Sequence, residues 1–274
     1  MNAYHVSELI IYPVKSLAGI SVKHWQVTPT GLYMDRKWML IDDAGHFMSQ
    51  RRLPAMALIN TAINDNCLVL SASGMAELTL PLSLTEGTRL STTVWHDQCE
   101  ALHFSSAADE WLSSVLQHPC RLVYHPDNSH RAVDPRYSHA TDQTAFSDGF
   151  PFLIVSENSL HALNHGLTDP VSMRRFRPNI VISGCPAYAE DSWREISIGA
   201  IDFRLPKPCS RCSVPAINPD TAQLTKEPLA TLNRLRKWQN KLYFGQNALH
   251  NQVGMLHRGD AVIVNATGAM QPPL

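Results

Sequence analysis

The sequence predicts an α+β fold that is mainly β, with two β-barrel-like lobes and a few helices. Short runs of β-branched and aromatic residues recur with turn residues between them, about every ten residues, which is typical of closed or strongly twisted antiparallel sheets. The pattern stops in a polar, irregular stretch at residues 126–150 and then starts again. A length of 274 residues and a hydrophobic content of 44% allow a large core. We therefore expect one domain at residues 1–125 and a second at residues 126–268.

The first half is predicted to form strands followed by one helix. The run at residues 36–50 is a hairpin candidate, because Asp43–Gly45 supplies turn residues at its centre. A helix is predicted over residues 105–119, where a serine can cap the first turn and a proline follows the last. The strand-like runs of this half are residues 5–14, 20–27, 36–50, 57–64, 67–73, 75–82 and 89–104.

The second half begins with the irregular stretch at residues 126–150. Loops of this length in compact domains are usually functional or disordered. His130 and His139 lie in it and His125 precedes it, and we expect all three rings to be exposed to solvent and without a role. Helices are predicted beyond it at residues 156–167 and 227–238, and strands at residues 151–156, 179–184, 193–199, 200–207, 212–217, 241–251 and 260–266.

Charge and composition exclude several classes of protein. The net charge is −1 and the pI is about 6.9, so the basic excess typical of nucleic-acid binding is missing. No apolar stretch approaches the roughly 20 residues of a membrane helix. The N-terminus lacks the basic and apolar regions of a signal peptide. The six cysteines are scattered, which favours reduced thiols, and we expect a cytoplasmic protein.

The cysteine pair in "KPCSRC", Cys209 and Cys212, has several possible roles. A structural zinc site needs four ligands, and the sequence contains no second pair of this spacing. A redox dithiol needs the pair at the start of a helix, whereas the residues that follow look strand-like. Taken alone, the pair is most simply two half-buried structural cysteines. A single thiolate offered to another metal is the remaining possibility.

Several further motifs occur together with this pair. They are "YPVKSLAG" (residues 12–19), "DRKWML" (35–40), "FRPNIVISG" (176–184), "EDSWREISIG" (190–199), "EPLATL" and "FGQN". In this order, and over residues 4–265, the chain resembles the MOSC family. The resemblance is to the branch with an N-terminal MOSC β-barrel domain, which includes amidoxime-reducing and hydroxylaminopurine-reducing enzymes.

The resemblance implies a molybdenum cofactor in a cleft between the two lobes. The metal in that family is held by a pyranopterin dithiolene that carries a phosphate. Cys212 matches the protein thiolate on molybdenum and is the expected catalytic residue, a soft ligand suited to this metal. Cys209 is then not a ligand. The residues that the resemblance assigns to cofactor binding are Lys15, Ser16, Arg36, Gly149, Phe150, Arg177, Asn179, Ser210, Arg211 and Cys212.

The resemblance also implies an activity, with alternatives. We expect a detoxifying reductase that removes oxygen from N-hydroxylated small molecules such as hydroxylamines, amidoximes and hydroxylated nucleobases. The alternative is a carrier or store of molybdenum cofactor or sulfur without turnover, and a metal-free β-barrel scaffold is a third interpretation. The binding residues would be the same in the first two cases.

Two departures from the family bear on partners and substrates. Several bacterial relatives have a fused ferredoxin-like domain, and this sequence shows no such cysteine cluster. We therefore expect electrons from a separate flavoprotein or iron–sulfur protein, acting on a monomer. The family's threonine-alanine-arginine-glutamine loop is "SQRR" here, which keeps Arg51 but adds the charge of Arg52 near the expected substrate mouth.

Overall fold

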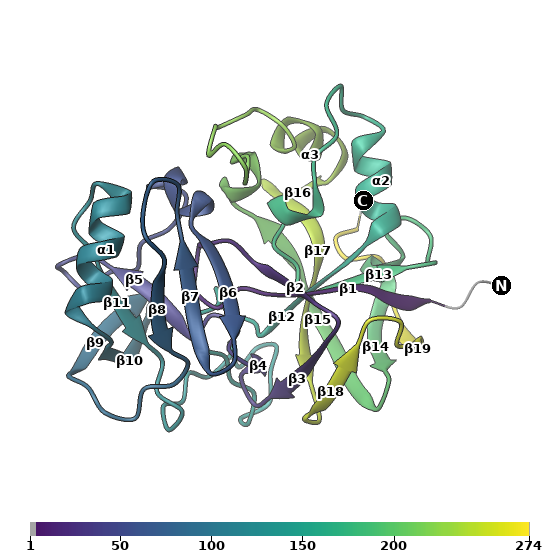
Figure 1. The fold of residues 1–274 in the computed structure, drawn as a ribbon. Coiled ribbons are helices and arrows are strands. Elements are labelled where there is room, and N and C mark those ends of the chain that lie inside the picture. Colours follow the sequence, from purple (N-terminus) through teal and green to yellow (C-terminus); the bar gives the residue numbers. More distant parts are fainter. Residues whose placement is uncertain (1–3, 274) are drawn as a thin grey trace.

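The computed structural model describes residues 4–273 and has two lobes, which lie side by side in Figure 1. The larger lobe holds a nine-stranded sheet in the order β19-β14-β15-β17-β12-β13-β1-β2, with β16 paired to β17. Its strands are β1 (His5–Ile11), β2 (Ile20–Val22), β12 (Phe152–Ser156), β13 (Ile180–Ser183), β14 (Trp193–Ile198), β15 (Ile201–Arg211), β16 (Lys237–Trp238), β17 (Lys241–His250) and β19 (Val262–Thr267).

Backbone hydrogen bonds also link the start of β1 to the segment that leads into β19, so the sheet curls round into a barrel. Val6 N donates to Asp260 O at 2.9 Å, and Val262 N donates to Tyr4 O at 2.8 Å. Closure leaves fewer unpaired strand edges. The interior is filled by apolar side chains, including that of Phe203. A small sheet of β3 (His24–Thr28), β4 (Gly31–Leu32) and β18 (Gly254–His257) lies beside the barrel.

The smaller lobe packs two sheets and one helix around a second core. One sheet has the order β5-β11-β10-β9 and the other β6-β7-β8. The core contains Trp38, Leu68 and Leu112, one from each of these sheets and one from the helix. The elements are β5 (Trp38–Ile41), β6 (Asn60–Asn64), β7 (Cys67–Ser71), β8 (Leu78–Pro81), β9 (Arg89–Val94), β10 (Asp97–His103), α1 (Ser106–Leu116) and β11 (Arg121–Tyr124).

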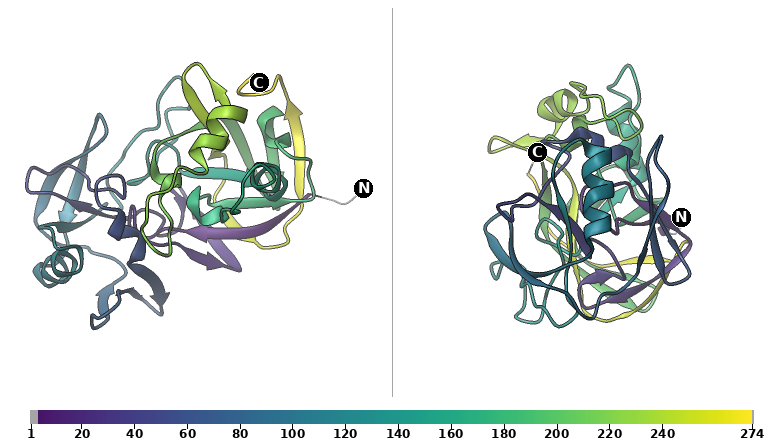
Figure 2. Two further views of the ribbon diagram at one scale, coloured as in Figure 1. Left: turned by 90° about the horizontal axis from the view of Figure 1, so that it is seen from above. Right: turned by 60° about the vertical axis from the view of Figure 1, so that its left-hand side comes forward.

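The helices lie at the periphery of the two lobes (Figure 2). Helix α1 begins as the sequence predicts, because the Ser105 hydroxyl accepts a hydrogen bond from Ala108 N at 3.3 Å. Within residues 4–273, no helix is long and apolar enough to cross a membrane. The remaining helical elements are α2 (Glu157–Asn164), α3 (Leu229–Leu235) and the 3₁₀ turns η1 (Pro54–Leu58), η2 (Met173–Arg175), η3 (Ala189–Ser192) and η4 (Val214–Ala216).

The predicted fold class, mainly β with two barrel-like lobes and a few helices, is confirmed, while several elements differ from expectation. The strand predicted at residues 212–217 is wrong: Pro215 lies in the 3₁₀ turn η4, which begins two residues after Cys212. Strand β15 runs past its predicted end at residue 207, and β11 and β18 were not predicted. Strands β1 and β2 belong to the larger sheet. The division into domains at residues 1–125 and 126–268 stays a prediction.

The junction between the lobes is irregular, as expected, with neither helix nor strand from residue 125 to residue 151. His130 and His139 are exposed, but the expectation for His125 is wrong, because its side chain is fully buried. Its backbone N–H donates to Lys37 O at 2.8 Å, directly after β11. Its ring packs edge-on against Phe146, with centroids 5.2 Å apart. Neither ring nitrogen makes a hydrogen bond of good geometry within residues 4–273.

The buried His125 ring is expected to make stability fall in acid. Burial, with the charges of Lys37 and Arg131, lowers its pKa to about 3, from an ordinary value of 6.5. Between these two pH values, His125 therefore binds a proton in the unfolded chain but not in the folded chain. The resulting stability is fully present above pH 6.5 and is lost toward pH 3, by at most about 1.4 kcal/mol per pH unit.

The measurement is the free energy of unfolding from pH 7 to pH 4 in the native protein and in His125→Phe. The variant should show a shallower loss in acid. The same substitution at the exposed His139 serves as the control and should leave the slope unchanged. An identical slope in native protein and His125→Phe would rule out this origin of acid sensitivity.

Candidate functional site

One cleft brings together every predicted site residue except Ser210. It lies where the loop after β1, the loop after β5, the junction and the end of β15 meet, and its empty volume is about 810 Å³, part of it open to solvent. The predicted residues that line it are Lys15, Ser16, Arg36, Gly149, Phe150, Arg177, Asn179, Arg211 and Cys212. These residues come from segments up to 197 positions apart, since 212 − 15 = 197.

Lys15 lies at the base of the cleft and its position is fixed by the junction. Its ammonium donates to Phe146 O at 2.7 Å and to the Asp148 carboxylate at 2.6 Å. The side chain is only 7% exposed. Burial lowers the pKa of this ammonium, while Asp148 acts to raise it. The neighbouring Ser16 is held by Gln50, whose side-chain N–H donates to Ser16 O at 2.7 Å.

Three cleft residues have a left-handed backbone that non-glycine residues seldom adopt: Ser16 (φ 70°), Arg36 (φ 50°) and Arg177 (φ 56°). Such conformations cost of order 1–3 kcal/mol each and concentrate at functional sites, where the surrounding structure holds them. Their coincidence in one cleft is independent of any sequence motif. It marks the cleft as a site with a constrained geometry.

Tyr12 connects two of these arginines and was not among the predicted site residues. The guanidinium carbon of Arg36 lies 4.3 Å from the centre of its ring, and that of Arg177 lies 4.1 Å away. Both contacts have the geometry of cation–π interactions. Gly19 makes the packing possible, because a Cβ there would lie 2.4 Å from the Tyr12 ring. The sequence signal that could have identified Tyr12 is its place at the start of the "YPVKS" motif.

Asn179 positions Arg36 and joins three segments. Its side-chain oxygen accepts from Arg36 Nη1 at 3.1 Å and from Leu153 N at 3.2 Å, and its amide donates to Ile10 O at 3.2 Å. The oxygen thus uses both lone pairs within the protein, and the Asn179 side chain also hydrogen-bonds to the Asp35 carboxyl. Arg36 pairs with Asp35 at 2.5 Å and at the same time lines the cleft. That Asn179 reads a pterin edge stays a prediction.

Both cysteines of the pair line the cleft. Cys209 also packs against the apolar cluster beside α3, and its sulfur accepts from Arg211 Nη1 at 3.0 Å. Burial raises the pKa of this thiol. Cys212 comes directly after β15 and lines the cleft, half-buried. No group of three or more His, Cys, Asp or Glu side chains within residues 4–273 is placed to hold a metal, so a four-ligand zinc site has no ligand set there.

Ser210 is not brought to the cleft. Side chains alternate across a strand, so its side chain points away from those of Cys209 and Arg211. It lines a different pocket with Tyr137 and Trp238, on the outer side of β15. The two loosely matched positions, Gly149 and Phe150, do line the cleft, and a Cβ at Gly149 would meet no atom within 4 Å.

The residues present fit an anionic, acceptor-rich cofactor. Five cationic side chains line the cleft against one carboxylate, that of Asp148. Buried N–H groups of Arg51, Arg177 and Arg211 have no hydrogen-bond partner within residues 4–273. Buried donors are normally paired, so a surplus of donors indicates that acceptors belong there. Cys212 adds a soft sulfur ligand beside this cationic surface. The cations lining the cleft are Lys15, Arg36, Arg51, Arg177 and Arg211.

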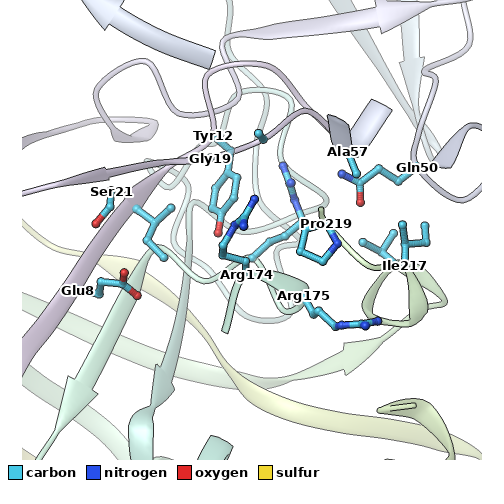
Figure 3. Close-up of a pocket in the computed structure, with 14 residues that line it drawn as sticks. Glu8, Tyr12, Gly19, Ser21, Gln50, Ala57, Arg174, Arg175, Ile217 and Pro219 are labelled. Atoms are coloured by element: carbon cyan, nitrogen blue, oxygen red, sulfur yellow. The ribbon is translucent and has the colours of Figure 1, made fainter. Parts of the chain in front are cut away.

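A second pocket of about 580 Å³ adjoins the cleft and shares Gln50, Arg177 and Val214 with it. Figure 3 shows Tyr12, Gln50 and Arg174 around this space. Burial raises the pKa of the Tyr12 phenol to about 12, so the hydroxyl stays protonated. Arg177 lines both pockets.

Comparisons with known proteins agree with this arrangement. The MOSC N-terminal beta barrel domain matches residues 3–119, and the MOSC domain matches residues 141–263. Mitochondrial amidoxime-reducing component 1 of Homo sapiens is 37% identical, over 94% of this chain and 82% of that protein. Mitochondrial amidoxime reducing component 2 of Bos taurus is 34% identical over the same shares. Molybdenum cofactor sulfurase of Oryza sativa subsp. japonica is 32% identical, over 88% of this chain and 32% of that protein. The chain therefore belongs to the MOSC family, in the group that contains the mitochondrial amidoxime-reducing components.

Proposed function

We propose that this protein is a molybdenum-cofactor-dependent oxidoreductase that reduces N-hydroxylated small molecules, including hydroxylamines, amidoximes and hydroxylated nucleobases. The observation that carries the proposal is the meeting of the Cys212 thiol and five cationic side chains in one cleft. The names of the relatives support it, since amidoximes carry an N–OH group and the sulfurase is named for the molybdenum cofactor. A detoxifying role belongs to the proposal.

Several residues of the cleft have a defined task in this proposal. Cys212 is the catalytic residue, and its thiolate would bind molybdenum. Lys15, Ser16 and Arg177 hold the phosphate through charge-assisted hydrogen bonds, which are stronger than neutral ones. Arg36 is held by Asn179 at the same wall of the cleft. When bound, the cofactor supplies two-electron redox chemistry and oxygen removal, while the protein binds and orients.

The overall reaction defines what the site must admit. Reducing a hydroxylamine, R–NHOH, to R–NH₂ and water breaks the N–O bond and consumes two electrons and two protons. The cleft is partly open to solvent, and Gly149 and Phe150 line it together with Cys212, so a small substrate can approach the thiol. Electrons come from a separate flavoprotein or iron–sulfur protein that binds transiently.

A carrier of molybdenum cofactor or sulfur is the second candidate, favoured by the match to a protein named molybdenum cofactor sulfurase. Both candidates use the same binding residues, so turnover decides between them. Purified holoprotein, reduced viologen and benzamidoxime are mixed, and benzamidine is measured. Formation of benzamidine beyond one equivalent per molybdenum establishes a reductase, and its absence favours the carrier.

The thiols support a cytoplasmic location as part of the proposal. All six cysteines are free. Free thiols persist in reducing compartments.

Replacing the two cysteines separately tests the metal assignment. Cys212→Ser is expected to abolish viologen-driven reduction and leave the fold intact, because the metal loses its thiolate. Cys209→Ser, the matched control, keeps an acceptor for Arg211 and should retain substantial activity. Steady-state rates per mole of folded protein provide the measurement. Equal loss in both variants would return the pair to a dithiol or a zinc site.

Removing the Arg177 guanidinium tests whether this residue binds the phosphate of the cofactor. A hydrogen bond to a charged group contributes roughly 1.5–3 kcal/mol. Arg177→Ala should therefore lower cofactor occupancy about tenfold or more. Molybdenum per mole of purified protein is measured, together with thermal stability, because Arg177 also donates to Leu17 O at 2.7 Å.

Arg174→Ala provides the control for that experiment. Arg174 is exposed and pairs with Asp220 at 2.6 Å, outside the cleft. It should leave the molybdenum content unchanged. Full molybdenum content in a folded Arg177→Ala protein would contradict the assigned role.

Electron supply gives a further prediction. The sequence has neither an iron–sulfur cysteine spacing nor a dinucleotide fingerprint. The purified protein should be inactive with NADH or NADPH alone and active with reduced viologen. Charge pairing at Arg51 and Arg52 mainly raises the association rate, so partner-driven turnover should fall as salt rises. Robust NADH-driven turnover by the isolated protein would contradict the need for a partner.

A further inference from the structure

The mouth of the cleft carries one negative side chain. Asp148 is the sole carboxylate that lines the cleft within residues 4–273. Its side chain is 63% exposed, compared with 7% for Lys15, 12% for Arg36 and 22% for Arg51. Asp148 is therefore the most exposed of these four charged side chains, and a substrate arriving from solvent meets it early.

Three neighbours fix the Asp148 carboxylate. Lys15 Nζ donates to Oδ1 at 2.6 Å, and Trp95 Nε1–H donates to the same oxygen at 3.2 Å. Arg51 Nη2 lies 4.0 Å from Oδ2. The surrounding protein atoms remove part of the solvent around the carboxyl and act to raise its pKa, but Lys15 and Arg51 outweigh this effect and hold the pKa well below its usual range. The negative charge is therefore present at neutral pH.

The indole of Trp95 braces this group from the smaller lobe. Trp95 lies in the turn between β9 and β10 with a left-handed backbone, φ 60°. Its ring lies 4.1 Å from the guanidinium carbon of Arg51 and 5.0 Å from the ring centre of Phe47. Both Phe47 and Arg51 line the cleft. Through these contacts, the turn that carries Trp95 helps to keep Phe47, Arg51 and the Asp148 carboxylate in fixed positions.

The cations deeper in the cleft do not cancel this effect once the cofactor is bound. Lys15, Arg36 and Arg177 face the space assigned to the anionic cofactor, whose phosphate offsets their charge. Asp148 pairs with Lys15 through one carboxylate oxygen, while its other oxygen lies 4.0 Å from Arg51 and its side chain stays largely exposed. A fixed negative charge at a partly solvated opening raises the association rate of cationic ligands and lowers that of anionic ligands.

We propose that Asp148 selects substrates by charge, so that the reductase accepts N-hydroxylated compounds bearing a positive charge in preference to anionic ones. The ligand class is a planar N-hydroxylated amidine with a cationic substituent. The inference rests on the proposed function, and it names the substrates that this site would favour. It assigns a specificity role to a residue that the sequence motifs did not single out.

The test uses three probes of one shape: benzamidoxime, its 4-trimethylammonium derivative and its 4-sulfonate derivative. Viologen-driven kcat/KM is measured for each and normalised to molybdenum content, because Asp148 also contacts Lys15. In Asp148→Asn the ratio of the cationic to the anionic probe should fall roughly tenfold, the size of effect that one nearby charge produces in partly solvated surroundings. The effect should shrink at high ionic strength. Asp148→Glu keeps the charge and should retain most of the ratio.

Asp127→Asn is a matched control. Asp127 pairs with Lys37 at 2.7 Å, with side-chain exposures of 80% and 8%, so it repeats the Lys15–Asp148 arrangement outside the cleft. This variant should leave the ratio unchanged. An unchanged ratio in Asp148→Asn, or an equal fall in Asp127→Asn, overturns the inference.

Binding separates this inference from the proposed function. Dissociation constants for the three probes are measured by calorimetry with oxidised holoprotein, where no turnover occurs. If the wild type binds the cationic probe more tightly through Asp148 but reduces none, the proposed function fails and charge selection stands. If the wild type reduces all three probes without a charge preference, the proposed function stands and charge selection by Asp148 fails. If it neither binds nor reduces them, both are overturned.

Discussion

The hydrogen bonds of Asn179 are the interaction on which the candidate site depends most. Its backbone links to Ile10 and Leu153, each at 2.9 Å, while its side chain binds both of those residues again and reaches Arg36. Three strands of the barrel and the loop before β5 are thereby fixed at one point. The residue is 1% exposed, and its partners shield these bonds from water. Loss of this amide would leave buried donors and acceptors unpaired, at a cost of about 1–3 kcal/mol each.

The arginines of the cleft take their positions from this junction. Arg36 is bound to Asn179 and to Arg177 O, and both guanidinium groups lie close to Tyr12. Two like charges held near one ring repel each other, and the ring's negative faces offset part of that repulsion. The same arrangement leaves donor groups without partners. The cleft is thus organised for an anion before any anion is present, so less ordering remains to be done when it binds.

Much of the fold and most of the candidate site could be predicted from the sequence. Alternation and turn residues predicted the long strands, because such signals are local. Nine of the ten residues that the motifs assigned to a cofactor line one cleft, and their roles stay predictions. The failures involve contacts between distant segments. Strand β11 is short and is specified by pairing with β5 and β10, and His125 is buried by residues that the sequence places elsewhere. Trp95 gave no signal, since only the folded chain brings the β9–β10 turn to the cleft mouth.

The cysteine strand shows the same limit. The sequence predicted that this strand ends at residue 207, yet β15 continues through Pro208 to Arg211. Its pairing with β17 shifts register between Arg204 and Lys207 and again between Pro208 and Ser210. Such irregularities admit proline and re-aim the side chains that follow. At this end of β15, Cys209 and Cys212 both line the cleft, while Ser210 between them lines a different pocket.

Closure of the barrel through its first and last strands has a consequence for biosynthesis. Strand β1 can pair early with β2, but its other partner β13 lies more than 170 residues later, and its start bonds to residues 260 and 262. One edge of this apolar strand therefore stays unpaired until those segments have been synthesised. Such long-range pairing slows folding and exposes strand edges meanwhile. The smaller lobe, whose core strands and helix are contiguous from β5 to β11, can form during that interval and hold the chain until the barrel is completed.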